Sequence, residues 1–235
     1  MTHTPRTPGP ALRTILLDID GTLIDSNDAH ARAWVDSLAK HGYVVQFEQV
    51  RPLIGKGGDK LLPELVGLDP DSGEAKRMGE TRSELFQREL PRLQPTRGAR
   101  ALLERFTDEG LELVVATSAN ADEVRALLEQ AGVSDLIQLA SSSDDADRSK
   151  PDPDIVQAAL RMSGSQAMHS AMLGDTPYDI EAASRARVPA VALRCGGWWS
   201  NDALAGAVAI YDDPADLLAH FDESPLGVAI ARSAR

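Results

Sequence analysis

Cysteine, aromatic residues and long apolar runs are all scarce in this chain. A single cysteine, Cys195, among 235 residues excludes a disulfide within the chain, and we interpret it as a small buried side chain. No stretch approaches the roughly 18 apolar residues of a membrane-spanning helix, and residues 1–12 lack the apolar segment of a secretory signal. The sequence therefore predicts a protein of a reducing compartment, the cytoplasm, with no membrane partner.

Positive charge is also in short supply. The chain carries 24 Lys and Arg against 36 Asp and Glu, a formal net charge of −12, whereas a protein that binds nucleic acid needs a basic surface. This balance argues against a nucleic-acid partner. It does not argue against a small phosphorylated substrate, because a few lysines or a bound cation can reverse the sign locally. The length suits one domain, or one domain with an insertion.

Short apolar runs of strand length recur along the chain and alternate with helical patterns. The runs lie at 13–19, 111–117, 135–141, 170–175 and 188–194. Helical patterns at 121–132, 154–164 and 179–187 lie between the later runs, and a final pair at 207–212 and 214–221 closes the sheet edge. Apolar strands that alternate with helices indicate an α/β fold, in which helices cover both faces of a parallel sheet.

The alternation is interrupted after the first run. Helical patterns at 27–42, 58–67 and 73–90 replace it, and a proline-containing segment, 90–98, returns the chain to the sheet. We therefore predict a small helical domain inserted after the first strand. The predicted units are a core of residues 11–26 and 96–222, a helical insertion of residues 27–95, and disordered tails of residues 1–10 and 223–235.

Acidic and polar residues follow the predicted strands, where ligands bind in parallel sheets. The stretch ILLDIDGTLIDS, residues 15–26, places Asp18 and Asp20 at the end of the first strand, and Gly21 allows a tight turn after them. The later strands or their loops add one hydroxyl pair, one lysine and two further acids: Thr117, Ser118, Lys150, Asp175 and Asp179. Clustered carboxylates ionise together only if they share a cation.

This residue set predicts phosphate chemistry. Oxygen ligands without histidine or cysteine indicate Mg²⁺, which accepts a phosphate oxygen as a further ligand. Thr117 and Lys150 would bind the other phosphate oxygens. Since aspartate can accept a phosphoryl group, one of the first two aspartates attacks phosphorus and the other moves protons.

Four short motifs follow the predicted strands in chain order: DIDGT, ATS, SKPDPD and GDTPYD. Together they resemble the four motifs of the haloacid dehalogenase superfamily. The resemblance is greatest to its phosphoglycolate phosphatase and beta-phosphoglucomutase-like members, which have a helical cap. The resemblance implies a Rossmann-like core with a helical cap and a Mg²⁺ cofactor. It implies that Asp18 is the nucleophile and a metal ligand, and that Asp20 is the general acid/base and offers its backbone carbonyl to the metal. The other implied roles are phosphoryl binding by Thr117, Ser118 and Lys150, metal ligation by Asp175, and support of the site by Asp179.

Two details narrow the activity. The dehalogenases of the superfamily lack the second aspartate of the first motif, so Asp20 favours phosphate chemistry. Related sugar phosphomutases usually carry Glu-Asp where this chain has Gly174-Asp175, so we predict a phosphomonoester hydrolase acting on a small phosphorylated metabolite. A sugar phosphomutase and a non-catalytic binding protein on the same fold are the alternatives. Phosphoglycolate, sugar phosphates and nucleotides all stay open as substrates, and we expect a monomer or weak homodimer.

Several residues outside the motifs have two interpretations each. Lys56, in a glycine-rich stretch, either contacts an anionic part of the substrate or is a solvated loop lysine. His30, one helical turn from Trp34, either faces the site or packs at the hinge. The loop with Trp198 and Trp199 is either an anchored surface loop or a contact surface.

Overall fold

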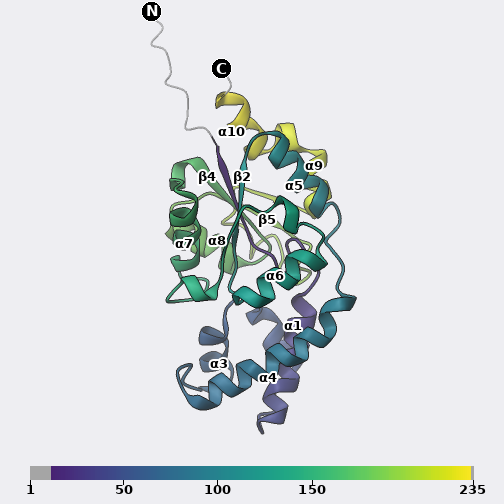
Figure 1. Ribbon diagram of the computed structural model, residues 1–235, viewed down its shortest axis with the longest axis vertical. Coiled ribbons are helices and arrows are strands. Elements are labelled where there is room, and N and C mark those ends of the chain that lie inside the picture. The colour runs from purple at the N-terminus through teal and green to yellow at the C-terminus, as the bar shows by residue number, and fades with distance from the viewer. Residues whose placement is uncertain (1–11, 234–235) are drawn as a thin grey trace, which may run out of the picture.

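The structure, a computed structural model, describes residues 12–233, which form a sheet-based domain and a helical domain side by side (Figure 1). All pairings in the six-stranded sheet are parallel, and the strand order is β3-β2-β1-β4-β5-β6. The strands are β1 (Thr14–Leu17), β2 (Glu112–Ala116), β3 (Leu139–Ser141), β4 (Ser170–Gly174), β5 (Ala190–Leu193) and β6 (Ala209–Tyr211). The predicted α/β class with a Rossmann-like parallel sheet is confirmed.

Helices cover both faces of the sheet because strand side chains alternate between them. Ile15 and Leu17 point to one face, which packs against α5 (Ala99–Asp108), α6 (Ala121–Gln130) and α9 (Pro214–Ala219). Leu16 points to the other, which packs against α7 (Asp154–Ser163) and α8 (Pro177–Arg185). With β1 central and its neighbours in register, the carboxyl ends of β1, β2 and β4 lie together.

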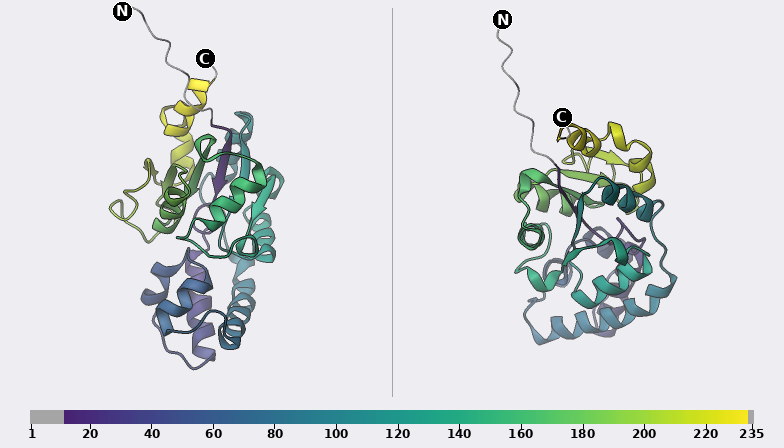
Figure 2. Two further views of the ribbon diagram at one scale, coloured as in Figure 1. Left: turned by 90° about the vertical axis from the view of Figure 1, so that its left-hand side faces the viewer. Right: turned by 45° about the horizontal axis from the view of Figure 1, so that its top comes forward.

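The regular elements between β1 and α5 are all helices. This segment contains α1 (Asn27–Lys40), α2 (Phe47–Val50), α3 (Gly58–Val66), α4 (Gly73–Glu89) and two 3₁₀ turns, and it has an apolar core of its own around Trp34, Leu38 and Met78. The two chain segments that connect it to the sheet run antiparallel: Asp25 N–H donates to Gln94 O at 2.9 Å, and Thr96 N–H donates to Leu23 O at 3.0 Å. The left view in Figure 2 shows this helical domain as a separate body below the sheet.

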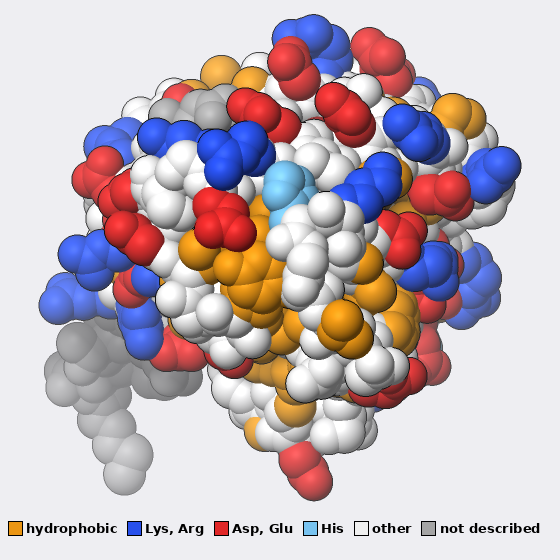
Figure 3. All heavy atoms as spheres, turned by 90° about the horizontal axis from the view of Figure 1, so that it is seen from below, with side chains coloured by type: hydrophobic (Ala, Val, Ile, Leu, Met, Phe, Trp, Pro, Cys, Tyr) orange, Lys and Arg blue, Asp and Glu red, His pale blue; other side chains and the backbone are white. Residues whose placement is uncertain are grey.

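Seen from below, the outer face of the molecule carries acidic and basic side chains interspersed around apolar surface (Figure 3). No helix within residues 12–233 is both long enough and apolar enough to cross a membrane.

The predicted strand 135–141 is correct only at its end. Residues Ser134–Leu136 form a 3₁₀ turn, and the strand itself is the short β3. The turn is held by Asp135, whose carboxylate accepts two hydrogen bonds from Arg100 at 2.8 Å, and the Gln138 side chain occupies the Leu113 N–H that a longer strand would use. Helices α2 and α5 were not predicted.

The predicted disordered tail is likewise wrong up to residue 233. A 3₁₀ turn, Phe221–Glu223, leads into α10 (Pro225–Ser233). Phe221 and Leu226 are buried in the main core, and the Ser224 hydroxyl accepts the Gly227 N–H at 3.1 Å at the start of the helix. The burial of these two apolar side chains orders the segment. The other predicted tail, residues 1–10, lies outside the described residues.

Candidate active site

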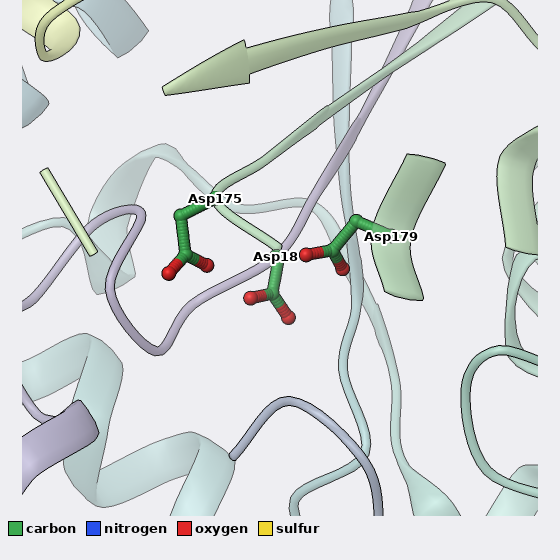
Figure 4. Close-up of side chains that lie close together, drawn as sticks. All are labelled: Asp18, Asp175 and Asp179. Carbon is green, nitrogen blue, oxygen red and sulfur yellow. The ribbon is translucent and has the colours of Figure 1, made fainter. Parts of the chain in front are cut away.

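Three buried carboxylates, from Asp18, Asp175 and Asp179, meet beyond the ends of β1 and β4. One oxygen from each lies within 4.8 Å of the others, and Figure 4 shows the three side chains gathered at one place. Asp18 follows β1 directly, Asp175 follows β4, and Asp179 lies in the first turn of α8. The sequence brings them together because adjacent parallel strands end at the same edge of the sheet.

Lys150 inserts a positive charge among these carboxylates. Its Nζ lies 2.5 Å from Asp18 Oδ1 and 2.7 Å from Asp179 Oδ1, and its side chain is 1% exposed. Burial lowers the pKa of Lys150, but the two carboxylates outweigh burial and hold that pKa above its usual value. The ammonium is therefore charged, and it leaves the cluster with more negative than positive charge.

The excess of carboxylates over cations in the cluster affects the pKa values of Asp18 and Asp175. Burial, followed by repulsion from Asp179, raises the pKa of Asp18 well above its usual value and the pKa of Asp175 to about 8. Asp175 keeps its place because its Oδ2 accepts a hydrogen bond from Asn27 Nδ2 at 2.8 Å. A buried set of carboxylate oxygens with too little positive charge fits a hard divalent cation. The cluster could therefore hold a metal ion.

Both carboxylate oxygens of Asp179 have hydrogen-bond partners within the protein. Its Oδ1 accepts from Lys150, and its Oδ2 accepts from the Thr176 hydroxyl at 2.6 Å and the Thr176 N–H at 3.0 Å. Thr176 and Asp179 also form a capping box at the start of α8, so Asp179 serves both the helix and the cluster. The support of the site that the resemblance implied for Asp179 is thus compatible with its place at the helix terminus.

The Asp20 side chain reaches toward the helical domain. Its Oδ1 accepts a hydrogen bond from the Ser26 hydroxyl at 2.5 Å and lies 2.7 Å from His30 Nε2. Burial raises the pKa of Asp20, but attraction to His30 and hydrogen bonds from His30 and Ser26 outweigh it and lower that pKa to about 2. Gly21 makes the turn with a φ of +74°, where a Cβ would lie 2.3 Å from Asp175 Oδ2.

His30 belongs to a chain of contacts between the two domains. Arg82 Nη2, from α4, lies 2.9 Å from His30 Nδ1; since a guanidinium only donates, Nδ1 accepts and Nε2 carries the hydrogen that His30 gives to Asp20. Arg82 Nη1 in turn donates to Glu123 Oε1 of α6 at 2.5 Å, and the Ser83 hydroxyl donates to the same oxygen at 2.9 Å. His30 therefore faces the site, and it also stacks on Phe86.

On the opposite side, the loop before α3 touches the segment around Lys150. A Cβ on Gly57 would lie 2.0 Å from Ser149 Oγ, so only glycine permits this approach. Lys60 Nζ lies 2.7 Å from Asp152 Oδ2, which adds an ion pair across the two domains. Sequence reasoning missed these contacts and those of Arg82 and Glu123, since no local pattern marks a partner so far away in the chain.

The two domains enclose a cavity of about 720 Å³ between them. Asp18, Asp20 and Lys150 line its inner end together with Thr117 and Ser118. Thr117 is 1% exposed, and the Ser118 hydroxyl is buried with no hydrogen-bond partner among the described residues. Donors of this kind beside a lysine suit the oxygens of a phosphate group. The structure thus brings seven predicted residues to one place, five of them around this inner end and Asp175 and Asp179 behind it.

Lys56 lies apart from that group. It lines the cavity, but its Nζ is 2.5 Å from Glu64 Oε2 and 4.8 Å from the centre of the Tyr178 ring. Trp198 and Trp199 lie outside the cavity: Trp198 stacks with Arg51 at 5.6 Å, and Trp199 meets Tyr178 edge-on.

Residues 15–193 match the family model of haloacid dehalogenase-like hydrolases. The chain belongs to this family. A phosphoglycolate phosphatase from Rhodospirillum rubrum is 30% identical over 214 residues, which cover 87% of this chain and 89% of that protein. A phosphoglycolate phosphatase from Pseudomonas syringae pv. syringae is 30% identical over 196 residues, 80% of this chain and 71% of that protein.

Solved structures agree with this membership of the haloacid dehalogenase-like hydrolases. The crystal structure of a hydrolase from Pseudomonas syringae superposes with a TM-score of 0.83 at 29% identity, covering 90% of this chain and 98% of that one. A beta-phosphoglucomutase from Clostridium difficile has the same fold, with a TM-score of 0.81 at 16% identity over 94% of this chain and 99% of that one. The chain is therefore an enzyme of a hydrolase family, and its sequence relatives place it among the phosphatases.

Proposed function

We propose that this haloacid dehalogenase-like hydrolase is a Mg²⁺-dependent phosphomonoester hydrolase that removes phosphate from a small metabolite through an aspartyl phosphate on Asp18. The observation that carries the proposal is the position of Asp18. Its carboxylate lies 2.5 Å from Lys150 Nζ, among the acids of a buried cluster, at the inner end of a cavity lined by Thr117 and Ser118. Nucleophile, phosphate donors and charge neutralisation thus meet at one point.

The residues fit the implied metal. Asp18, Asp175 and the backbone carbonyl of Asp20 would hold Mg²⁺, while Asp179 supports them through Lys150 and Thr176. When bound, Mg²⁺ supplies positive charge against the phosphoryl oxygens and the carboxylates. The charge deficit of the cluster, seen in the raised pKa of Asp175, is what the ion would correct.

The chain's own groups account for both chemical steps. An oxygen of Asp18 attacks phosphorus, the ester bond breaks, and Asp20 in its acid form gives the leaving oxygen a proton. Asp20, now a carboxylate, then takes a proton from water as that water attacks the aspartyl phosphate, which releases phosphate and frees Asp18. The hydrogen bond from His30 Nε2 holds Asp20 of the free enzyme in the carboxylate form, which the second step requires. In the proposed first step Asp20 therefore has to take up its proton together with the substrate.

The helical segment has the proposed role of a cap. Residues 27–95 contribute Trp34, Leu62 and Arg82 to the cavity, so this segment shields the reacting groups from water. The core that it covers comprises residues 11–26 and 96–222. Phosphatases among the chain's relatives, such as the Rhodospirillum rubrum protein, support hydrolysis rather than phosphoryl transfer between sugar hydroxyls.

The test is phosphate release by the full chain from p-nitrophenyl phosphate and from sugar phosphates. We expect release to stop in excess chelator and return with Mg²⁺, and we expect quenched enzyme to carry phosphate on a peptide that contains Asp18. Undiminished activity in chelator would remove the metal. An isomerised sugar phosphate without free phosphate would show a mutase, and no turnover of any ester would indicate a binding protein.

A further inference from the structure

The cavity's charged residues fall into two groups, those with ion-pair partners and those without. Four of the five lysines and arginines that line the cavity are engaged: Lys56 with Glu64, Lys60 with Asp152, Arg82 with Glu123, and Lys150 with Asp18 and Asp179. A second anionic group on the substrate would have to break one of these pairs to bind any of the four. Lys150 is in addition committed to the phosphate end.

The α3 N-terminus offers an incoming anion little more. Helix N-termini attract negative charge, but the first turn of α3 already contains Asp59, and its Oδ2 accepts the Ser149 N–H at 3.2 Å. A carboxylate of the protein thus lies where a carboxylate of the substrate would bind.

Free carboxylates, in contrast, are present at the rim. Asp71, Glu80 and Asp147 line the cavity, and none of them has a side-chain hydrogen bond or ion pair within the described part of the chain. Among the described lysines and arginines that line the cavity, only Lys76 also lacks a side-chain hydrogen bond or ion pair. It lies one helical turn from Glu80 on α4. The rim therefore offers mainly hydrogen-bond acceptors with negative charge, which suit hydroxyl and ammonium groups.

The size and the walls of the cavity point the same way. Its volume of about 720 Å³ lies in the range of roughly 300–1,000 Å³ typical of sites for sugar-sized or larger ligands. Trp34 and Leu62 give it an apolar wall on the cap side. A two-carbon ester would leave most of this space to water.

We infer that the substrate is a phosphate monoester with a hydroxyl- or amine-bearing body of sugar size and no second anionic group. The inference rests on the proposed phosphatase activity and narrows its substrate. It places phosphoglycolate and sugar bisphosphates among the poor substrates, because their second anion would meet Asp71, Glu80 and Asp147, and Lys76 alone of the lining lysines and arginines is free to pair with it.

The experiment compares kcat/KM of the full chain with Mg²⁺ for four esters: glucose 6-phosphate, glucosamine 6-phosphate, phosphoglycolate and fructose 1,6-bisphosphate. We expect the first two to exceed the last two by at least about tenfold, the scale of placing like charges together in a site. Glucosamine 6-phosphate against glucose 6-phosphate shows whether the rim prefers an ammonium or a hydroxyl. The inference would be overturned by equal values across the panel, or by a preference for phosphoglycolate or fructose 1,6-bisphosphate, the two esters with a second anionic group.

A charge reversal at the rim gives an independent measurement. Glu80→Lys should raise the kcat/KM ratio of phosphoglycolate to glucose 6-phosphate by about tenfold. The matched control is Glu84→Lys, one turn further along α4, where the exposed side chain does not line the cavity, and it should leave the ratio unchanged. An equal shift in both variants, or none in either, would contradict the role of the rim. Hydrolysis of p-nitrophenyl phosphate separates the two proposals: if it too is absent, the phosphatase proposal fails, and the substrate class falls with it.

Discussion

Asp18 combines two properties that rarely occur together in one carboxylate. It is buried among like charges, which raises its pKa, and it is held 2.5 Å from a lysine that favours its charged form. One lysine holds this carboxylate in place, and other acids surround it. Such a carboxylate can react with an electrophilic phosphorus atom when a cation accompanies the phosphoryl group. This is the condition for attack on a metal-bound phosphate.

Replacement of that carboxylate is the most direct test at the residue scale. Asp18→Asn keeps the shape but loses the charge needed for attack, so we expect phosphate release to fall by at least ~10³-fold. Circular dichroism of the same preparation checks that the variant is folded. A folded variant that retains more than a tenth of the wild-type rate would rule out Asp18 as the nucleophile.

Asp20 has two proposed tasks that different leaving groups can separate. Nitrophenolate leaves without a proton, whereas an alkoxide needs one, and hydrolysis of the aspartyl phosphate is the same for both. In Asp20→Ala we therefore expect p-nitrophenyl phosphate to give a burst of about one nitrophenolate per active site, followed by slow turnover. Stopped-flow absorbance measures the burst. Equal rate losses for aryl and alkyl esters, without a burst, would restrict Asp20 to the metal or the turn.

Gly21 offers a comparison between steric contact and backbone strain. Gly21 and Gly42 both have positive φ, +74° and +88°, but a Cβ on Gly21 would meet Asn27 at 2.1 Å and Asp175 at 2.3 Å, and a Cβ on Gly42 would meet nothing within 4 Å. Alanine at either position should cost about 1–2 kcal/mol of unfolding free energy from strain. We expect only Gly21→Ala to lose activity in addition, by about 10² or more, because it displaces Asp175. Thermal unfolding and steady-state rates of both variants check this.

At the scale of elements, the contact chain from Asp20 through His30 and Arg82 to Glu123 ties α1 and α4 to α6. Burial raises the pKa of Glu123, but Arg82 and His30 outweigh it and hold that pKa below 4.5. A lowered pKa in the folded state means that the contribution of Glu123 to stability is present above the unfolded value and is lost as pH falls through the folded value. The link between the domains is therefore strongest near neutral pH.

The corresponding prediction concerns Glu123→Gln. At pH 7 this variant should be less stable than wild type by about 1–3 kcal/mol, because it leaves buried Arg82 without its anion. Below pH 4.5 the difference should begin to shrink, because the unfolded chain becomes protonated there, and it should vanish once pH falls below the lowered folded-state pKa of Glu123. Denaturant unfolding at both pH values measures the effect, and a difference that does not change with pH would disprove the ionic origin of the contact.

Sequence patterns predicted the elements that have a strong local signal. The apolar strands other than β3, the helices that end before Gly132 and Gly164, and the helices between residues 27 and 90 were predicted within a few residues. The start of segment 135–141 was predicted as a strand because its residues are apolar, but these residues pack against the core from a turn. Hydrogen bonds from Arg100 stabilise this turn, and the sequence of the segment alone does not predict them because Arg100 is distant in the chain.

The site divides in the same way between predictable and unpredictable parts. Asp18, Thr117, Lys150 and Asp175 could be predicted because each follows a strand or its loop, and the order of parallel strands then decides where they meet. The orientation of Asp20 toward His30 and the pairing of Lys56 with Glu64 depend on how the chain packs in three dimensions. The spacing of residues in the sequence does not predict these contacts.

At the scale of the whole molecule, α10 packs against the main core and contributes a buried side chain to it. Leu226 is 4% exposed beside Phe221, so Leu226→Ala should lower the free energy of unfolding by about 2–5 kcal/mol. Glu223→Ala, at an exposed position three residues earlier, is the control and should change it by less than about 0.5 kcal/mol. Equal melting temperatures for both variants would mean that the tail contributes nothing to the fold.

The central position of β1 governs the timing of folding. Residues 14–17 leave the ribosome early, but their partners Glu112–Ala116 and Ser170–Gly174 are made about 100 and 150 residues later. At roughly 5–20 residues per second, the second partner follows β1 by about 8–30 s. This buried strand thus stays unpaired during much of synthesis, while the helical insertion, whose contacts are local, can form first. Nascent chains shorter than about 170 residues are therefore expected to need a chaperone, and their aggregation during translation should be relieved by adding the segment that contains β4.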